Sequence, residues 1–482
     1  MSLFADRAPN DPLRYFEMIC GIPHPSGFEQ ELGKKILNLA IEKGYAARMD
    51  ESGNVRIDRP AAPGMEKAPH IILQGHLDMV PKAAPGKIFD FTQTPVKLII
   101  ENGYIRADDT TLGADNGAGC AAAFSILFDP ALKAGKLSGL FTTGEETGLI
   151  GANALKPDML EGDWLFNLDS GNYHRFCIGC AGGAKLSFTI PISRTTPPEG
   201  NTFRVKLGGL EGGHSGEMID KKTGNALILL SRFLKEISCA SIIFFEGGSA
   251  DNAIPADAEA VIVTTLSAED LKSKANEFTI RSSGEFNAPE SYRIEITETA
   301  CNTKSMTPEF SKLFLRLVSS VKNEVFDFDE SLGIVKTSSN FAIVNTSDDQ
   351  LLINTSQRSL TDSEREKATG DIRRHFAPLG GTANVAGVYS GWPARPESEP
   401  VKIAAKVHRE QYGTDLELYA IHAGLETGAF AKKKESLQIV SFGPPEEDIH
   451  TERERLNIAK YEDFCKFLRL VVKKAAELKS GE

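Results

Sequence analysis

Residues 70–80 read HIILQGHLDMV, a short apolar run that ends on an imidazole and a carboxylate. A continuous apolar run of this kind is typical of a buried strand. The two ionisable groups at its end, His76 and Asp78, either face water or hold something charged. The pattern of the rest of the chain decides between these two interpretations.

The segments on either side of this run alternate between helix and strand patterns. Helices are predicted at 10–20, where Pro12 stands in the first turn, and at 28–44, which ends on a glycine. The strand patterns NVRID, HIILQ, LSGLFTT and DWLFNL alternate with these helices and with the alanine-rich helix NGAGCAAAFSILF. This alternation predicts an α/β fold with a mostly parallel sheet and helices on both of its faces.

The chain is too long for a single hydrophobic core, because 482 residues exceed the usual size of one domain. Near residue 187 the pattern changes, and ISRTTPPEGN resembles a linker. Strands and amphipathic helices follow, and the first pattern returns after GWPARPESEP. We therefore predict a main domain made of residues 1–186 and 394–482, with a second α/β domain inserted at 187–393.

Composition limits the classes of partner. Apolar residues make up 41% and charged residues 25% of the chain, as is usual for globular proteins. The net charge of −12 disfavours nucleic acid and anionic membranes as partners. The first residues do not show the basic region followed by an apolar region that is typical of a signal peptide, and no apolar run has bilayer length. The seven scattered cysteines fit a reducing compartment. We expect a cytoplasmic protein.

Acidic and imidazole side chains follow the ends of several predicted strands or precede a helix. They are His76 and Asp78 after HIILQG, Asp115 before the alanine-rich helix, Glu145 and Glu146 after LSGLFTTG, Asp169 at the end of DWLFNLD, and His450 after SLQIVSFGPPEED. Because the carboxyl ends of parallel strands meet in one crevice, we expect these groups to converge. Carboxylates that lie this close need a compensating cation, so the set predicts a divalent metal site. Zinc suits these ligands best, with manganese and cobalt as alternatives.

Two side chains beside the predicted ligands have roles of their own. Asp78 can accept a hydrogen bond from the ring nitrogen of His76 that does not bind metal, which fixes the tautomer. Of the adjacent Glu145 and Glu146, one can bind metal while the other takes a proton from water as a general base. Each motif alone is equally compatible with a solvated loop. Their joint occurrence at successive strand ends favours the metal site.

The motifs GHLDMV, TTLGADNGAG, TTGEETGLIGA and NLDS, with a late histidine, resemble the co-catalytic zinc exopeptidases, the family that includes carboxypeptidase G and aminoacylase. Within it, IPHPSG, GLEGGHSG, HAGLETG and SFGPPEEDIH are most similar to the aminoacyl-histidine (Xaa-His) dipeptidases. The resemblance covers nearly the whole chain. It implies a metal-dependent dipeptidase for short peptides, with two bound metal ions and the inserted domain as a lid.

The resemblance also implies how the two ions are held. Asp115 would bridge them. His76 and Asp169 would bind one ion, and Glu146 and His450 would bind the other. A cis peptide bond would follow the bridging aspartate.

For the reaction, the resemblance implies Glu145 as the catalytic base and Asp78 as the carboxylate that orients His76. His214, in GLEGGHSG, would help to stabilise the tetrahedral intermediate. Two further residues, Asn252 and Arg358, match positions that bind the terminal carboxylate of the substrate.

The motif HAGLETG leaves two interpretations open. His422 and Glu426 would line the substrate pocket, or would simply end a strand and cap a helix.

Three rival functions and the oligomeric state also stay open. A tripeptide aminopeptidase or an N-acyl amino acid hydrolase would use the same metal site, and a non-catalytic peptide-binding protein would keep the fold alone. Relatives of this family form dimers, so a homodimer is the alternative to a monomer.

Overall fold

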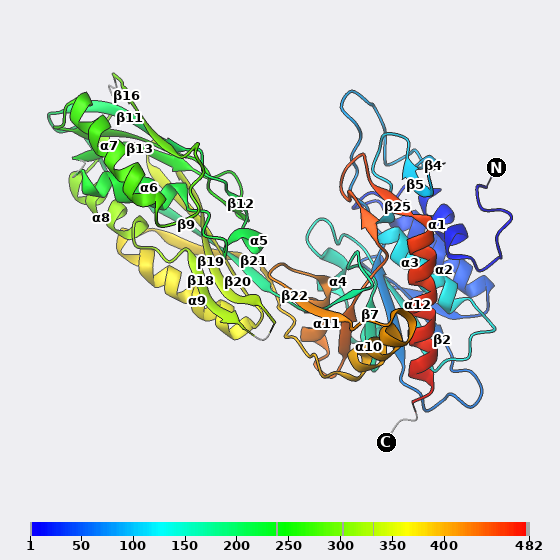
Figure 1. Cartoon of the computed structure of the whole chain (residues 1–482). Helices are drawn as coiled ribbons and strands as arrows, with labels where there is room; N and C mark the ends of the chain where they lie inside the picture. The colour runs from blue at the N-terminus through cyan, green and yellow to red at the C-terminus, as the bar shows by residue number, and fades with distance from the viewer. Residues whose placement is uncertain (1, 238–239, 301–302, 331, 479–482) are drawn as a thin grey trace. The chain divides into compact units, whose positions relative to one another are not determined.

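The computed structural model describes residues 2–237, 240–300, 303–330 and 332–478 (Figure 1). The chain forms two compact units. Unit 1 comprises Met1–Gly179, Trp392–Ala420 and Leu425–Glu482, and unit 2 comprises Cys180–Gly391 and Ile421–Gly424. Within the described ranges, no helix has the length and apolar character needed to span a bilayer.

Unit 2 begins earlier than the predicted insertion at 187–393. The strand β9 (Gly182–Pro191) belongs to its sheet and pairs along its whole length with β20 (Gln350–Ser359). The predicted linker also lies inside unit 2, where β10 (Arg194–Thr195) pairs with β17 (Ser305–Met306). Because a single residue separates β9 from the preceding strand, β8 (Arg175–Cys180), the sequence does not mark where one unit ends.

A sheet of eight strands forms the centre of unit 1. In spatial order the strands are β1 (Ala46–Met49), β2 (Val55–Arg59), β6 (Leu137–Thr142), β3 (Ile71–His76), β7 (Trp164–Asn167), β23 (Gln438–Ser441), β8 (Arg175–Cys180) and β22 (Glu417–Ile421). The central strands from β6 to β23 are parallel, whereas β1, β2 and β8 pair antiparallel with their neighbours. The predicted α/β fold is confirmed, with parallel pairing confined to the centre.

Helices cover this sheet. The main helices of unit 1 are α1 (Pro12–Cys20), α2 (Gln30–Glu42), α3 (Ala114–Leu127), α4 (Ile150–Ala154), α10 (Glu399–Tyr412), α11 (Glu426–Lys433) and α12 (Ile458–Ala476). Every residue of β3, β6 and β7 is buried, which requires cover on both faces. Helix α3 packs against β3 and β6, and its only residue that is not buried is Asp115. The alanine-rich helix therefore lies in the core and presents one carboxylate at its start.

A small second sheet in unit 1 contributes to the site. It consists of β24 (Glu446–Glu447), β25 (Arg455–Asn457), β5 (Tyr104–Ala107) and β4 (Leu98–Glu101). The connection between β24 and β25 contains His450.

Unit 2 is built on an antiparallel sheet of nine strands. In spatial order these are β16 (Arg293–Glu298), β11 (Asn201–Gly208), β15 (Ala258–Thr264), β13 (Ser241–Gly247), β19 (Ile334–Thr346), β20, β9 and β21 (Thr382–Tyr389), with β18 (Glu324–Asp329) also paired to β19. Its main helices are α6 (Ala226–Glu236), α7 (Ala268–Ser283), α8 (Pro308–Val318) and α9 (Asp362–Phe376).

The two faces of the unit 2 sheet differ in their burial. Along β15, Ala260 and Ile262 join the large core shared with the four helices, whereas Val261 and Val263 belong to a small cluster. Successive residues of a strand point to opposite faces, so the helices cover one face of the sheet. The inserted unit is thus α/β, as predicted.

Candidate metal centre

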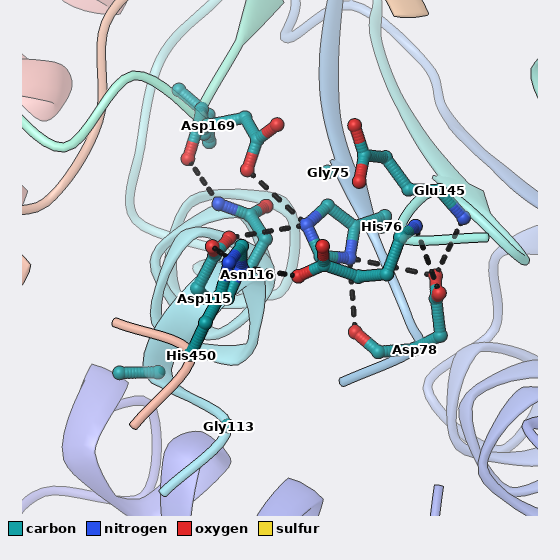
Figure 2. Close-up of polar contacts among 12 residues, drawn as sticks. Gly75, His76, Asp78, Gly113, Asp115, Asn116, Glu145, Asp169 and His450 are labelled. Carbon is teal, nitrogen blue, oxygen red and sulfur yellow. Dashed lines mark hydrogen bonds and ion pairs between the residues drawn. The ribbon is translucent and has the colours of Figure 1, made fainter. Parts of the chain in front are cut away.

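Strand β3 brings His76 to the carboxyl end of the parallel strands. The side chain is 1% exposed, and its Nδ1 donates a hydrogen bond to the main-chain oxygen of Asp78 at 2.9 Å. A carbonyl can only accept, so Nε2 is the nitrogen with a free lone pair in the neutral ring. This Nε2 lies 3.2 Å from Asp115 Oδ1 and 3.3 Å from Asp169 Oδ1 (Figure 2).

The second oxygen of Asp115 faces the other imidazole. His450 Nε2 lies 3.1 Å from Asp115 Oδ2 and 2.9 Å from Glu146 Oε1. Asp115 therefore lies between two imidazoles and gives one oxygen to each (Figure 2). The peptide bond between Asp115 and Asn116 is cis, which confirms that expectation from the family resemblance.

The separations of these atoms fit metal coordination. Two ligands of a tetrahedral zinc ion, each at about 2.0–2.1 Å from it, lie about 3.3 Å apart. His76, Asp115 and Glu146 each offer a ligand atom, and these atoms lie within 4.8 Å of one another. Asp169 Oδ1 is buried and accepts no hydrogen bond of good geometry, although the His76 ring is near. Two imidazoles and three carboxylates thus form a donor set suited to divalent metal.

The electrostatics of the cluster also call for cations. Burial raises the pKa of Asp169 to about 7, against the effect of His76. Hydrogen bonds to Asp115 and Glu146 raise the pKa of His450 to about 10. Burial lowers the pKa of His76, but its neighbouring carboxylates outweigh burial and raise it well above 6.5. The carboxylates thus favour positive charge at the two imidazoles, and metal ions bound there would supply that charge in place of protons.

Asp78 holds the turn that carries the two adjacent glutamates. Its Oδ1 accepts the N–H of Glu145 at 2.9 Å, and its Oδ2 accepts the N–H of Glu146 at 3.2 Å and the hydroxyl of Ser26 at 2.8 Å. The predicted contact between this carboxylate and His76 Nδ1 is a longer ion pair of 3.5 Å. The sequence suggested a carboxylate that orients His76, and in the structure the shorter hydrogen bonds of Asp78 hold Ser26, Glu145 and Glu146.

Glu145 lies among these charges without belonging to the two ligand groups. Burial raises its pKa well above 4.5, and Asp169 and Glu146 add to this against the opposing effect of His76. A carboxylate with a raised pKa close to a metal site is suited to accept a proton from water.

Three glutamates near the site, the buried Glu29 and Glu454 and the half-buried Glu446, were missed in the sequence. Glu454 binds the backbone before Asp115, Glu29 accepts the N–H of Gly144 at 3.0 Å, and burial together with Asp115 raises the pKa of Glu446. The acidic residues around positions 446 and 452 are evident in the sequence itself. Nothing in their spacing tells which side chains point inward.

Arg358 is one of the predicted substrate-binding residues and belongs to unit 2. It is 8% exposed, its Nη1 donates to the Tyr389 hydroxyl at 2.8 Å, and its Nε is buried without a hydrogen-bond partner. Burial and the positive charge of Arg358 lower the pKa of His422 to about 3 and also lower that of His214. The Nε donor of Arg358 is free to bind a further acceptor, and the nearby imidazoles do not compensate its positive charge. Such a guanidinium is suited to bind an anion such as a carboxylate.

Two other predicted substrate-binding residues are Asn252 in unit 2 and Glu426 in unit 1. Asn252 is exposed, and its main-chain oxygen accepts the N–H of Ser215 at 2.8 Å. Glu426 belongs to unit 1, is 1% exposed and accepts hydrogen bonds from Gln74 at 2.7 Å and Thr142 at 2.8 Å. It therefore links β3 to β6, which favours a structural role over contact with substrate.

The fold and the site together define a metal-dependent hydrolase. The carboxyl ends of parallel strands hold a divalent-metal donor set, and Glu145, a half-buried glutamate of raised pKa, lies beside it.

Comparisons with known proteins give the family. The model of peptidase family M20/M25/M40 matches residues 72–474, so the chain belongs to this family, which is metal-dependent. The chain is 34% identical over 466 residues to a cytosol non-specific dipeptidase of Escherichia coli (strain K12). This alignment covers 94% of this chain and 96% of the relative. The resemblance inferred from the motifs is confirmed.

Comparisons with solved structures agree with this family assignment. An aminoacylhistidine dipeptidase from Vibrio alginolyticus matches with a TM-score of 0.91 and 33% identity over 98% of both chains. A tripeptidase from Staphylococcus aureus shares the fold, with a TM-score of 0.61 and 18% identity over 97% of this chain and 98% of its own.

Proposed function

We propose that the protein is a cytosolic dipeptidase that hydrolyses Xaa-His and related dipeptides with the help of two divalent metal ions. The observation that carries the proposal is the position of Asp115, whose two oxygens lie 3.2 and 3.1 Å from the imidazoles of His76 and His450. The relatives described as dipeptidases, which align along nearly the whole chain, support the substrate class. The description of the Escherichia coli relative as a cytosol enzyme supports the cytosol.

The ligands divide into two groups around the shared carboxylate. His76 and Asp169 would hold one ion and Glu146 and His450 the other, with Asp115 between them. Zinc suits this mixture of nitrogen and oxygen ligands, and manganese and cobalt suit it as well.

Divalent ions bound there would lower the pKa of a water molecule and polarise the carbonyl of the scissile peptide bond. Glu145 would take the proton of that water on its carboxylate and deliver it to the nitrogen of the leaving amine. Asp78 would keep Glu145 in place through its bond to the Glu145 N–H. In unit 2, Arg358 and Asn252 would bind the terminal carboxylate of the substrate, and His214 would stabilise the oxyanion.

Hydrolysis of a substrate panel before and after chelation tests the function. We expect Xaa-His and other dipeptides to be cleaved at least tenfold faster than tripeptides and N-acetyl amino acids. Activity should disappear on chelation and return with zinc, manganese or cobalt. Preferred cleavage of tripeptides or acyl amino acids would contradict the proposal, and so would activity that resists a strong chelator.

His450→Ala tests the division of the ligands. Removing one imidazole from the second group should lower the bound metal by about one ion per chain while the first group stays filled. Metal content measured by mass spectrometry checks this, with His375→Ala in unit 2 as the control. Equal metal content in the two variants would remove His450 from the ligand set.

A further inference from the structure

One buried side chain binds the backbone of the loop that leads into α3. Glu454 is 3% exposed. Its Oε2 accepts the N–H groups of Leu112 at 2.8 Å and Gly113 at 3.2 Å. Its Oε1 accepts those of Ala114 at 2.7 Å and Asp115 at 3.3 Å. Four consecutive backbone donors thus converge on a single carboxylate.

The start of α3 needs such a partner. The first N–H groups of a helix have no acceptor within it, and a side chain at the N-cap residue normally supplies one. Here Asp115 (φ −81°, ψ 103°) and Asn116 (φ −111°, ψ 29°) depart from helical backbone angles, so the start of α3 is kinked, and Gly113 before it, whose φ of 76° favours glycine, has no side chain to offer. Glu454 provides the missing acceptor from a point 340 residues beyond Ala114, and its negative charge suits the positive end of the helix.

The last of the four N–H groups bound by Glu454 belongs to Asp115, the residue that lies between the two imidazoles. The N–H of Asp115 is bound to Glu454, while its Oδ2 faces His450, four positions before Glu454 in the same segment. This segment therefore contributes an imidazole to the site and also fixes the backbone of the central carboxylate. Both contacts disappear together if the segment moves.

We propose that Glu454 is a positioning residue, which holds the backbone at 112–115 so that both oxygens of Asp115 face their imidazoles. The inference rests on the proposed function for its link to catalysis, but its geometry concerns metal binding alone. An error of about 1 Å in such a ligand is enough to weaken a site strongly. The competing explanation is that Glu454 only stabilises α3.

The test compares Glu454→Gln and Glu454→Asp with a neighbouring control, Glu452→Gln, whose wild-type carboxylate pairs with the exposed Arg453. Gln has the same length as Glu, but its side-chain NH₂ group is a donor and cannot accept from the backbone N–H groups of 112–115. Asp keeps the negative charge, but its side chain is one methylene shorter. We expect the zinc affinity of Glu454→Gln, measured by competition with a chromophoric chelator, to fall about 10–100-fold. The visible absorption of the cobalt-loaded variant should change, kcat should fall more than KM rises, and Glu454→Asp should recover part of each loss.

A purely structural role predicts a different result. Glu454→Gln would then melt at a lower temperature but would match Glu452→Gln in zinc affinity, cobalt spectrum and kcat, and this outcome would overturn the proposal. If neither variant folds, amide hydrogen exchange of the metal-free wild type decides. Protection at 112–115 supports the proposal, and exchange as fast as in exposed loops refutes it. A wild type that binds metal but cleaves no peptide would refute the dipeptidase function without affecting these measurements.

Discussion

Glu145→Gln is expected to lower kcat by about 10²–10⁴-fold, the usual contribution of a general base. The amide of Gln keeps the shape of the side chain but cannot accept a proton from water. Metal content should stay at the wild-type level, because Glu145 lies outside the two groups of ligands around Asp115. KM should change little. Single-turnover rates and metal analysis of the same sample check both expectations.

The pH profile gives a second readout for the same variant. Burial raises the pKa of Glu145, and a base works only when it is unprotonated. Wild-type kcat/KM should therefore fall as the pH falls through this raised pKa, and the residual activity of Glu145→Gln should lack that acid limb. The exposed Glu161→Gln serves as the control. Substantial activity in Glu145→Gln with an unchanged acid limb would assign the base to another group.

The sequence predicts the convergence of the site better than its finer geometry. His76, Glu145 and Asp169 follow fully buried strands whose carboxyl ends must meet, so their proximity follows from the order of parallel strands. Their individual roles stay predictions. The placement of His450 depended on the family motif, because β23, the last strand of the central sheet before it, ends nine residues earlier at Ser441.

The contacts that hold the site were not predictable from spacing. Asp78 and Glu454 both act through hydrogen bonds to backbone N–H groups, and such donors are the same in every residue. No residue type marks the partner, and the sequence distance between Glu454 and Ala114 is 340 residues. The start of unit 2 was misplaced for a related reason, since a single residue separates β9 from β8 and only its pairing with β20 shows which sheet β9 joins.

Asp115→Asn is expected to have the largest effect on metal binding. The carboxylate lies between two imidazoles, so its charge contributes to both groups of ligands at once. An amide has one oxygen and no charge, and loss of several kcal/mol of stabilisation by the ions corresponds to a fall in activity of about 10³-fold or more. Neither ion should remain after dialysis, whereas His450→Ala should lose only one.

Thermal unfolding distinguishes loss of metal from loss of fold in this variant. A ligand that binds only the native state raises the melting temperature, by an amount that grows with the logarithm of its concentration relative to Kd. Zinc should therefore stabilise the wild type and the control Asp158→Asn, which alters an exposed carboxylate, but should leave Asp115→Asn unchanged. If zinc raised the melting temperature of Asp115→Asn as much as that of the control, the two ions could not share this carboxylate, and two separate mononuclear sites would have to replace the bridged centre.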